Sequence, residues 1–180
     1  MIKALALPDV PGLVVVIGHA ASGKSLFAED GAMSDAVARG VRPTYLATAR
    51  AEDDEMRAKV AAHAARRGTA WETVEAATGL DAACAAARGV VLVDCATMWL
   101  TGLVLDDVPW EAEAERWLGA MRANGDASFW VVTNDVGGGV VPDNALARRF
   151  QRAQGALNQR LAAAAWRVAL VTAGLPHWLK

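Results

Sequence analysis

Five short runs of apolar residues constrain the fold of this chain more than any other feature. Turn-forming residues flank each run, and the runs cover residues 13–17, 44–48, 90–94, 128–134 and 167–172. Apolar residues follow one another within a run, without the strict alternation that a solvent-facing surface would produce. We therefore interpret the runs as strands buried on both faces, which is typical of a mostly parallel sheet between two layers of helices.

Alanine-rich stretches with helical periodicity separate these runs, and they cover residues 25–39, 53–67, 80–88, 111–123 and 144–166. Alanine has the highest helix propensity and lets a helix pack closely on a sheet. The alternation predicts a three-layer α/β domain. Because 180 residues fit one domain and no linker or repeat interrupts them, we expect an N-terminal extension over 1–12 and a single catalytic domain over 13–180.

Composition excludes several classes of protein. A hydrophobic content of 54% excludes a disordered chain, and a net charge of -2 excludes a general nucleic-acid binder, so any anion site must be local. Two cysteines, Cys84 and Cys95, cannot build a disulfide framework or a zinc site. Pro8 interrupts the apolar start before it reaches signal-peptide length, and no run approaches the roughly 20 residues that span a bilayer. We expect a cytoplasmic protein that does not insert into membranes.

A phosphate-binding motif follows the first predicted strand. Residues 18–25 match G-x-x-x-x-G-K-[ST], and they are Gly18, His19, Ala20, Ala21, Ser22, Gly23, Lys24 and Ser25. In this motif the glycines let backbone N–H groups surround phosphate oxygens at the start of a helix, the lysine reaches the β and γ phosphates, and the serine hydroxyl binds Mg²⁺. The motif predicts a P-loop NTPase fold of the RecA-like type. The other x positions, including His19, have no fixed task.

The metal of a P-loop also needs an acidic partner at the end of a neighbouring strand. Asp94 ends the third apolar run, so its carboxylate would lie at the carboxyl edge of the sheet and could hold Mg²⁺ together with Ser25. An aspartate that only caps a turn is the alternative. These residues indicate a nucleotide-dependent phosphotransferase or motor.

A second basic element lies in the predicted helix over 53–67. Helical spacing places Lys59, His63 and Arg67 on one face. Neighbouring cations favour a neutral, nucleophilic imidazole and would stabilise a triphosphate that it attacks. A solvated helix whose charges suit the helix dipole explains the same pattern, and the residues alone leave both interpretations open.

Taken together, these motifs resemble the bifunctional adenosylcobinamide kinase and adenosylcobinamide-phosphate guanylyltransferase family of cobalamin biosynthesis. The resemblance extends over nearly the whole chain. Besides the P-loop, it is carried by residues 45–49, 53–67, 71–75, 94–101, 133–142, 146–150 and 155–159.

The resemblance implies two reactions in one protein, with ATP or GTP as substrates and Mg²⁺ as cofactor. A nucleoside triphosphate first phosphorylates the aminopropanol hydroxyl of adenosylcobinamide. His63 then attacks the α-phosphate of GTP and carries the GMP that is transferred to the phosphorylated corrinoid, with Lys24 serving the triphosphate. The nucleotide contacts implied outside the P-loop are Ala47, Thr48, Ala49, Ala64, Ala65, Arg66, Arg67, Glu75 and Asp94.

Glu75 would accept hydrogen bonds from guanine, although a surface carboxylate after a strand is the alternative. The glycines at 137–139 could approach the corrinoid or form a flexible turn. The family resemblance also implies a homotrimer, for which the candidate interface residues are Trp99, Trp110 and Trp117.

Three positions depart from the family pattern. Ala21 and Lys59 stand where arginine is usual, and Asp135 stands where glutamate is common. Losing the P-loop arginine removes one phosphate contact but leaves Lys24 in place. Two other functions remain as alternatives: a small-molecule kinase without a covalent step, and a RecA-like binding module switched by nucleotide.

Overall fold

The computed structural model describes residue 10, residues 12–50, residue 65 and residues 68–180. Its strands are β1 (Leu13–Gly18), β2 (Thr44–Ala47), β3 (Glu72–Glu75), β4 (Gly89–Asp94), β5 (Ala127–Asn134), β6 (Arg167–Thr172) and β7 (Leu175–Trp178). Its helices are α1 (Lys24–Arg39), the short 3-10 helix η1 (Gly68–Ala70), α3 (Leu80–Ala86), α4 (Ala96–Leu105), α5 (Trp110–Ala123) and α6 (Ala145–Ala164). The predicted helix over 53–67 lies outside the described residues except for Ala65, which is helical and exposed.

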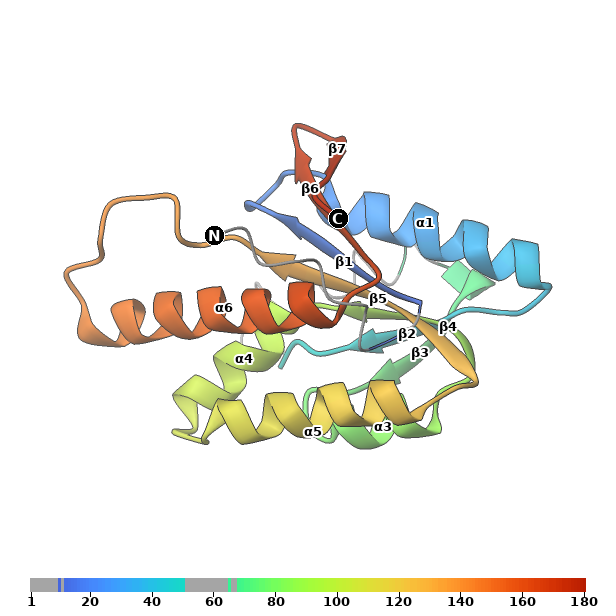
Figure 1. Ribbon diagram of the computed structural model, residues 1–180, viewed down its shortest axis with the longest axis horizontal. Coiled ribbons are helices and arrows are strands. Elements are labelled where there is room, and N and C mark those ends of the chain that lie inside the picture. Colours follow the sequence, from blue (N-terminus) through green and yellow to red (C-terminus); the bar gives the residue numbers. More distant parts are fainter. Residues whose placement is uncertain (1–9, 11, 51–64, 66–67) are drawn as a thin grey trace.

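The strands form one seven-stranded sheet in the order β3-β2-β4-β5-β1-β6-β7. Each of the first six pairs with its neighbours in parallel, and β7 pairs with β6 in the antiparallel direction. Figure 1 shows this sheet through the middle of the molecule, with β7 folded back at one edge. The predicted three-layer α/β class is confirmed.

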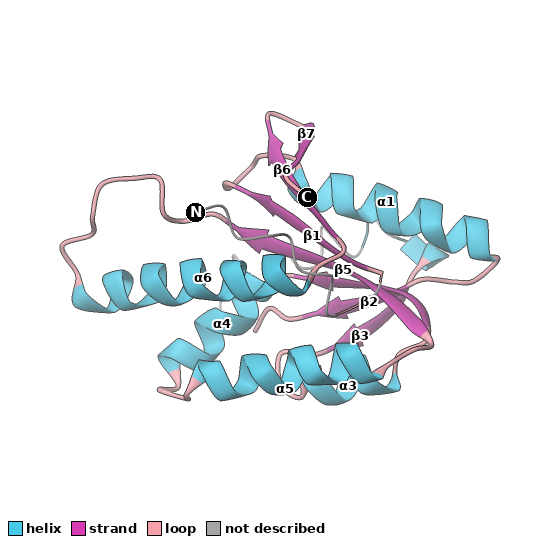
Figure 2. Ribbon diagram, viewed as in Figure 1, coloured by secondary structure: helices cyan, strands magenta, loops and turns pink. Residues whose placement is uncertain are grey.

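Helices cover both faces of the sheet (Figure 2). Alternate residues of the central strands, such as Val14 and Val16 of β1, pack under α1 against Ala28 and Ala32. The intervening strand residues pack against α3, α4, α5 and α6 on the other face. Each central strand is apolar on both faces because each face meets a helix layer, which explains the continuous apolar runs.

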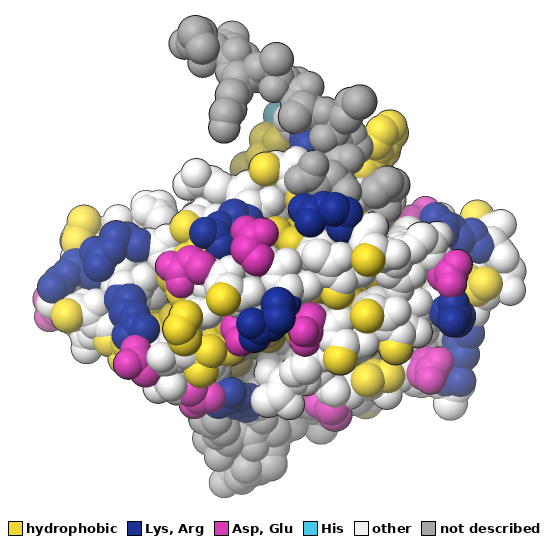
Figure 3. Space-filling view, turned by 60° about the horizontal axis from the view of Figure 1, so that its bottom comes forward, with side chains coloured by type: hydrophobic (Ala, Val, Ile, Leu, Met, Phe, Trp, Pro, Cys, Tyr) yellow, Lys and Arg dark blue, Asp and Glu magenta, His cyan; other side chains and the backbone are white. Residues whose placement is uncertain are grey.

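Charges on the outer helices pair locally. Arg116 of α5 forms an ion pair with Glu113 and another, longer one with Asp81, while Arg160 of α6 lies 3.7 Å from Glu115. Figure 3 shows one face of the molecule, on which acidic and basic side chains are interspersed. The described part of this face therefore does not present the broad basic surface that a nucleic-acid binder needs. Among the described residues no helix is long and apolar enough to cross a membrane.

Besides the short η1, the described part of the chain contains three elements that the periodicity does not predict. β3 has four residues, all exposed, so it lacks the apolar signal of the central strands. α4 begins two residues after β4 and is apolar nearly throughout, so it has no amphipathic pattern. β7 contains Pro176, which an edge strand tolerates.

One expectation about particular residues is wrong. Trp99, Trp110 and Trp117 are 5%, 8% and 0% exposed and lie in the monomer core, so they offer almost no surface to a partner subunit. Val10, within the expected N-terminal extension, is also buried, and its N–H donates to Ala164 O. At this residue the extension is part of the core.

Candidate functional site

The carboxyl edge of the sheet gathers most of the residues that the sequence singles out. Six parallel strands end there, with Gly18, Ala47, Glu75, Asp94, Asn134 and Thr172 as their last residues. Four of these, Gly18, Ala47, Glu75 and Asp94, are predicted nucleotide contacts that come from segments far apart in the chain. Ligands in open α/β sheets bind at this edge.

The P-loop connects β1 to α1 at this edge. Gly23 caps the helix with φ 89°, and Ala21 also has a positive φ of 57°. Lys24 is buried, and its Nζ donates to His19 O at 3.0 Å, so the ammonium group lies across the mouth of the loop. A phosphate in the loop would take the place of this carbonyl as partner of Lys24, because an anion makes the stronger hydrogen bond.

The two strands beside β1 hold the P-loop in place. After β5, Asp135 N donates to Gly18 O at 3.1 Å, and His19 Nδ1 donates to Asp135 O at 3.0 Å. In the β6–β7 turn, Gly174 N donates to Ser22 O at 2.8 Å. A Cβ on Gly18 would lie 2.4 Å from Ser22 Oγ and 2.7 Å from Val171 O, so only glycine fits here.

Asp94 lies on the α1 face of the sheet. Val90 and Leu92 of β4 pack in the cluster under α1, and the two-residue period of a strand puts Asp94 on the same side. Tyr45 Oη donates to Asp94 Oδ2 at 2.9 Å and fixes one carboxylate oxygen. The strand that ends in Asp94, β4, is not adjacent to β1, because β5 lies between them. Asp94 is therefore two strands away from the P-loop.

The loop after β2 is tied to the same region. Thr48 is buried, its Oγ1 donates to Cys95 O at 2.7 Å and its N–H donates to Asp94 O at 3.3 Å. Arg50 Nη2 lies 2.5 Å from Asp106 Oδ2, and this hydrogen bond lowers the pKa of the Asp106 carboxyl. These contacts fix the chain where it leaves the sheet toward residue 51.

The remaining predicted residues divide into two groups. Glu75 ends β3 opposite Ala47 and is exposed. Outside the described residues lie Lys59, His63, Ala64, Arg66 and Arg67. The predicted basic face around His63 therefore stays a prediction.

The structure contains a buried polar network at the end of β5 that the site predicted from the sequence does not include. Thr133 Oγ1 donates to Asn158 Oδ1 at 2.7 Å, Gln154 Nε2 donates to the same oxygen at 2.8 Å, and Asn158 Nδ2 donates to Asn134 O at 2.9 Å. A sequence signal does exist: Gln154 and Asn158 are four residues apart on a helix whose inner face is otherwise apolar.

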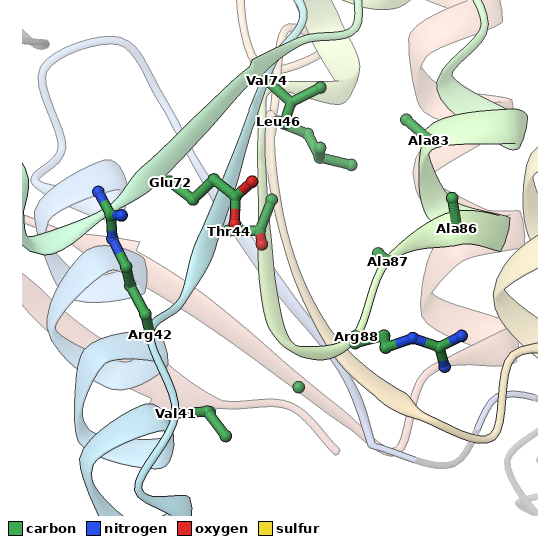
Figure 4. A pocket seen from close by; sticks show the side chains of 11 residues that line it. Val41, Arg42, Thr44, Leu46, Glu72, Val74, Ala83, Ala86, Ala87 and Arg88 are labelled. Carbon is green, nitrogen blue, oxygen red and sulfur yellow. The ribbon is translucent and has the colours of Figure 1, made fainter.

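A cavity of about 460 Å³ lies at the opposite edge of the sheet. Residues at or just before the starts of β2 and β3, including Arg42, Thr44 and Glu72, line it together with Ala83 and Ala86 of α3 (Figure 4). Arg42 is already engaged by the carbonyl oxygens of Thr69 and Trp71. This cavity lies at the amino ends of the strands and is separate from the nucleotide site.

Both cysteines are free and buried. Burial raises the pKa of Cys84 to about 12 and that of Cys95 to about 11, and Asp94 adds to the shift at Cys95. Thiols that stay protonated at neutral pH are poor nucleophiles. Neither cysteine is therefore a nucleophile at this site.

Comparison with known proteins agrees with this geometry. The crystal structure of the flagellar accessory protein FlaH from Methanocaldococcus jannaschii superposes with a TM-score of 0.55 and 12% sequence identity, covering 96% of this chain and 80% of FlaH. This similarity shows the fold alone. The family described as cobinamide kinase / cobinamide phosphate guanyltransferase matches residues 14–179. The chain belongs to this family.

Individual relatives match over nearly their full length. The bifunctional adenosylcobalamin biosynthesis protein CobP of Pseudomonas aeruginosa is 39% identical over 171 residues, which cover 92% of this chain and 96% of CobP. The bifunctional adenosylcobalamin biosynthesis protein CobU of Salmonella typhimurium is 38% identical, with 91% of this chain and 97% of CobU covered. CobU of Escherichia coli is 35% identical over the same shares. The family resemblance and the fold class predicted from the sequence are both confirmed.

Proposed function

We propose that this protein is an adenosylcobinamide kinase and adenosylcobinamide-phosphate guanylyltransferase that uses one nucleotide site for both reactions. The observation that carries the proposal is the P-loop, with Lys24 across its mouth and Asp94 on the same face, in a chain of the cobinamide kinase family. The products of the two steps are adenosylcobinamide phosphate and adenosylcobinamide-GDP.

The P-loop supplies binding and charge stabilisation for the kinase step. Backbone N–H groups at the start of α1 face the phosphates, and Lys24 exchanges the His19 carbonyl for oxygens of the β and γ phosphates. The transferring phosphoryl group passes through a loose transition state, so positioning and charge supply most of the catalysis. Ser22 and Gly23, fixed by the β6–β7 turn, keep this cradle formed before nucleotide binds.

Ser25 and Asp94 fit a magnesium ion. Both offer oxygen ligands on the α1 face, and Tyr45 orients the carboxylate of Asp94. Mg²⁺ usually takes one or two protein oxygens and completes its shell with phosphate oxygens and water. Bound there, the ion would neutralise charge that develops on the phosphates.

His63 is the proposed nucleophile of the second reaction. Its nitrogen forms a bond to the α-phosphorus of GTP, pyrophosphate leaves with the electron pair, and the GMP then passes to the phosphate oxygen of adenosylcobinamide phosphate. A covalent intermediate replaces one difficult displacement with two easier ones. This role is supported by family membership and by the cations Lys59, Arg66 and Arg67 around His63 in the sequence. Glu75, exposed at the end of β3, would accept from guanine.

Four further features belong to the same proposal. The segment over 13–180 acts as one catalytic domain, the glycines at 137–139 approach the corrinoid, the protein forms a homotrimer, and it works in the cytoplasm, where its nucleotide substrates are abundant. Trp166 and Trp178, which are 56% and 43% exposed, replace the three buried tryptophans as candidate subunit contacts.

Labelled GTP tests the proposal. We expect acid-labile label on the protein from GTP labelled at the α-phosphate and none from GTP labelled at the γ-phosphate, because only GMP stays on the histidine. A kinase without a covalent step would show no protein label, and a nucleotide-switched binding module would show no dependence on corrinoid. Folded protein that never takes up the α label would rule out the guanylyltransferase reaction.

Lys24→Ala should impair both reactions, because one cradle holds the triphosphate in each. Arg88→Ala is the matched control, since Arg88 is an exposed cation at the amino edge of the sheet. Guanylylation at the wild-type rate in Lys24→Ala would contradict a shared site.

A further inference from the structure

Asn134 lies between the P-loop and Asp94, the two parts of the predicted phosphate and metal site. It is the last residue of β5, the strand that separates β1 from β4. Its Cα pairs with that of Gly18, where the P-loop begins, and Val132 on the same strand pairs with Asp94. Neighbouring strands are about 4.8 Å apart, so Asn134 lies one strand from the P-loop and one from Asp94.

The side chain of Asn134 lies on the same face of the sheet as the P-loop helix. Trp130 and Val132 of β5 belong to the cluster under α1, and the two-residue period of a strand extends this face to Asn134. Thr133, between Val132 and Asn134, points to the other face and donates a hydrogen bond to Asn158 of α6. The amide of Asn134 therefore shares a face with Lys24 and Asp94.

Both backbone groups of Asn134 are held by side chains. Its N–H donates to Thr97 Oγ1 at 2.8 Å, and its carbonyl accepts from Asn158 Nδ2 at 2.9 Å. Gln154, which is fully buried, donates to Asn158 Oδ1 and to Thr133 Oγ1 and so fixes this support. The next residue, Asp135, ties the strand end to Gly18 O. These hydrogen bonds fix the backbone of Asn134 and therefore the position of its Cα and Cβ atoms.

The side-chain amide itself makes no hydrogen bond to any other residue in the described part of the chain. It is half-buried, at the edge where the triphosphate is proposed to bind. A residue whose backbone is held by Thr97 and Asn158, and whose side-chain donor is unused, is suited to bind a ligand. An amide also adds a donor without a charge that would compete with Asp94 for a cation.

We infer that the Asn134 amide donates a hydrogen bond to the γ-phosphoryl group during the kinase step, an assignment that rests on the proposed function. In that step the substrate hydroxyl oxygen forms a bond to the γ-phosphorus. The bond from this phosphorus to the β–γ bridging oxygen breaks, its electron pair stays on the nucleoside diphosphate, and the hydroxyl proton passes to solvent. Asn134 stabilises the charge on the phosphoryl oxygens as they move between donor and acceptor.

The two reactions should depend on this contact differently. In the kinase step the γ-phosphoryl group is the one that moves, so a donor aimed at it acts in the transition state. In guanylylation the bond that breaks is at the α-phosphorus, and the γ-phosphate keeps the same contact in ground and transition states. Losing the contact should therefore lower kcat of the kinase but affect guanylylation mainly through KM for GTP.

The test compares Asn134→Ala and Asn134→Asp with wild type in both assays. Removing one such donor from a transition state typically costs about 10²–10³ in kcat. We expect a loss of this size in phosphorylation of adenosylcobinamide by Asn134→Ala, with the maximal rate of α-label uptake within about 3-fold of wild type. Asn134→Asp keeps the shape but replaces the donor with a negative charge, so its kinase kcat should fall at least as far.

Thr172→Ala is the matched control, because Thr172 ends a parallel strand at the same edge but on the side of β1 away from Asp94. It should match wild type in both reactions. The inference is overturned if Asn134→Ala keeps kinase kcat within about 3-fold of wild type, or if Asn134→Asp restores it, as a purely structural role would allow. Equal loss of kinase and guanylylation kcat in Asn134→Ala would also overturn it. Failure of wild type to take up α label would instead refute the proposed function.

Discussion

Alanine substitution of the two glycines at the ends of α1 separates backbone strain from the structure of the phosphate loop. Gly23 and Gly40 both have left-handed backbones, with φ 89° and 65°. A Cβ on Gly40 meets nothing within 4 Å, whereas one on Gly23 lies 3.0 Å from Gly174 Cα. The pair therefore shares the conformational cost and differs in the neighbour.

The expected magnitudes follow from these contacts. An L-residue in the left-handed region costs about 1–2 kcal/mol, so Gly40→Ala should lower the free energy of unfolding by that amount. Gly23→Ala should lose about 1–3 kcal/mol more, because the turn at Gly174 is held by its bond to Ser22 O at 2.8 Å and cannot retreat freely. Shifting this loop would also misdirect N–H donors, worth about 1.5–3 kcal/mol each toward a charged partner. Nucleotide affinity should then fall at least about 10-fold.

Urea unfolding followed by tryptophan fluorescence measures the first quantity, and calorimetric titration with a non-hydrolysable GTP analogue measures the second. Gly40→Ala should bind the analogue as wild type does. If both variants lose the same stability and bind nucleotide equally well, the described contact between the P-loop and the β6–β7 turn has no energetic role.

Three other perturbations test separate parts of the structure. Tyr45→Phe removes the hydroxyl that orients Asp94, so the Mg²⁺ concentration for half-maximal kinase activity should rise about 10-fold, and an unchanged Mg²⁺ dependence would refute this role. Trp117→Ala should lower the free energy of unfolding in urea by about 3–5 kcal/mol, because Trp117 is fully buried. Trp166→Ala should lower it by less than about 1 kcal/mol, because Trp166 is 56% exposed. Similar losses in the two variants would contradict the assignment of Trp117 to the core. Burial raises the pKa of Cys95 from 9.0 to about 11, so unfolding releases its proton above pH 9. Its stabilisation should be complete below pH 9 and should fall by about 1.4 kcal/mol per unit toward pH 11. Unfolding of Cys95→Ala should depend less steeply on pH over this interval, and an equal slope would refute the shift.

The central sheet was predictable because its strands are buried on both faces. Each of the strands β1, β4 and β5 contains an unbroken run of at least four apolar residues, and this continuity is typical of a parallel sheet between two helix layers. The edge strands β3 and β7 are exposed and short, so they carry no such pattern. Their position depends on pairing with a neighbour, which the local sequence does not encode.

The site was predictable where a motif has a fixed task and not where it depends on topology. The P-loop and Asp94 were predictable from residue types at the ends of predicted strands. The strand order, however, puts β5 between β1 and β4, and the sequence alone does not reveal which strand lies between the P-loop and Asp94. The role inferred for Asn134 and the network of Gln154 and Asn158 become visible only once this order is known.

Mapping the covalent adduct tests the central claim most directly. The protein is incubated with GTP and Mg²⁺, digested at a pH that preserves phosphoramidates, and its peptides are examined by mass spectrometry before and after addition of adenosylcobinamide phosphate. We predict GMP on the peptide that contains His63, its loss when the corrinoid phosphate is added, and the matching appearance of adenosylcobinamide-GDP. GMP on another residue, or an adduct that the corrinoid phosphate does not discharge, would contradict the account.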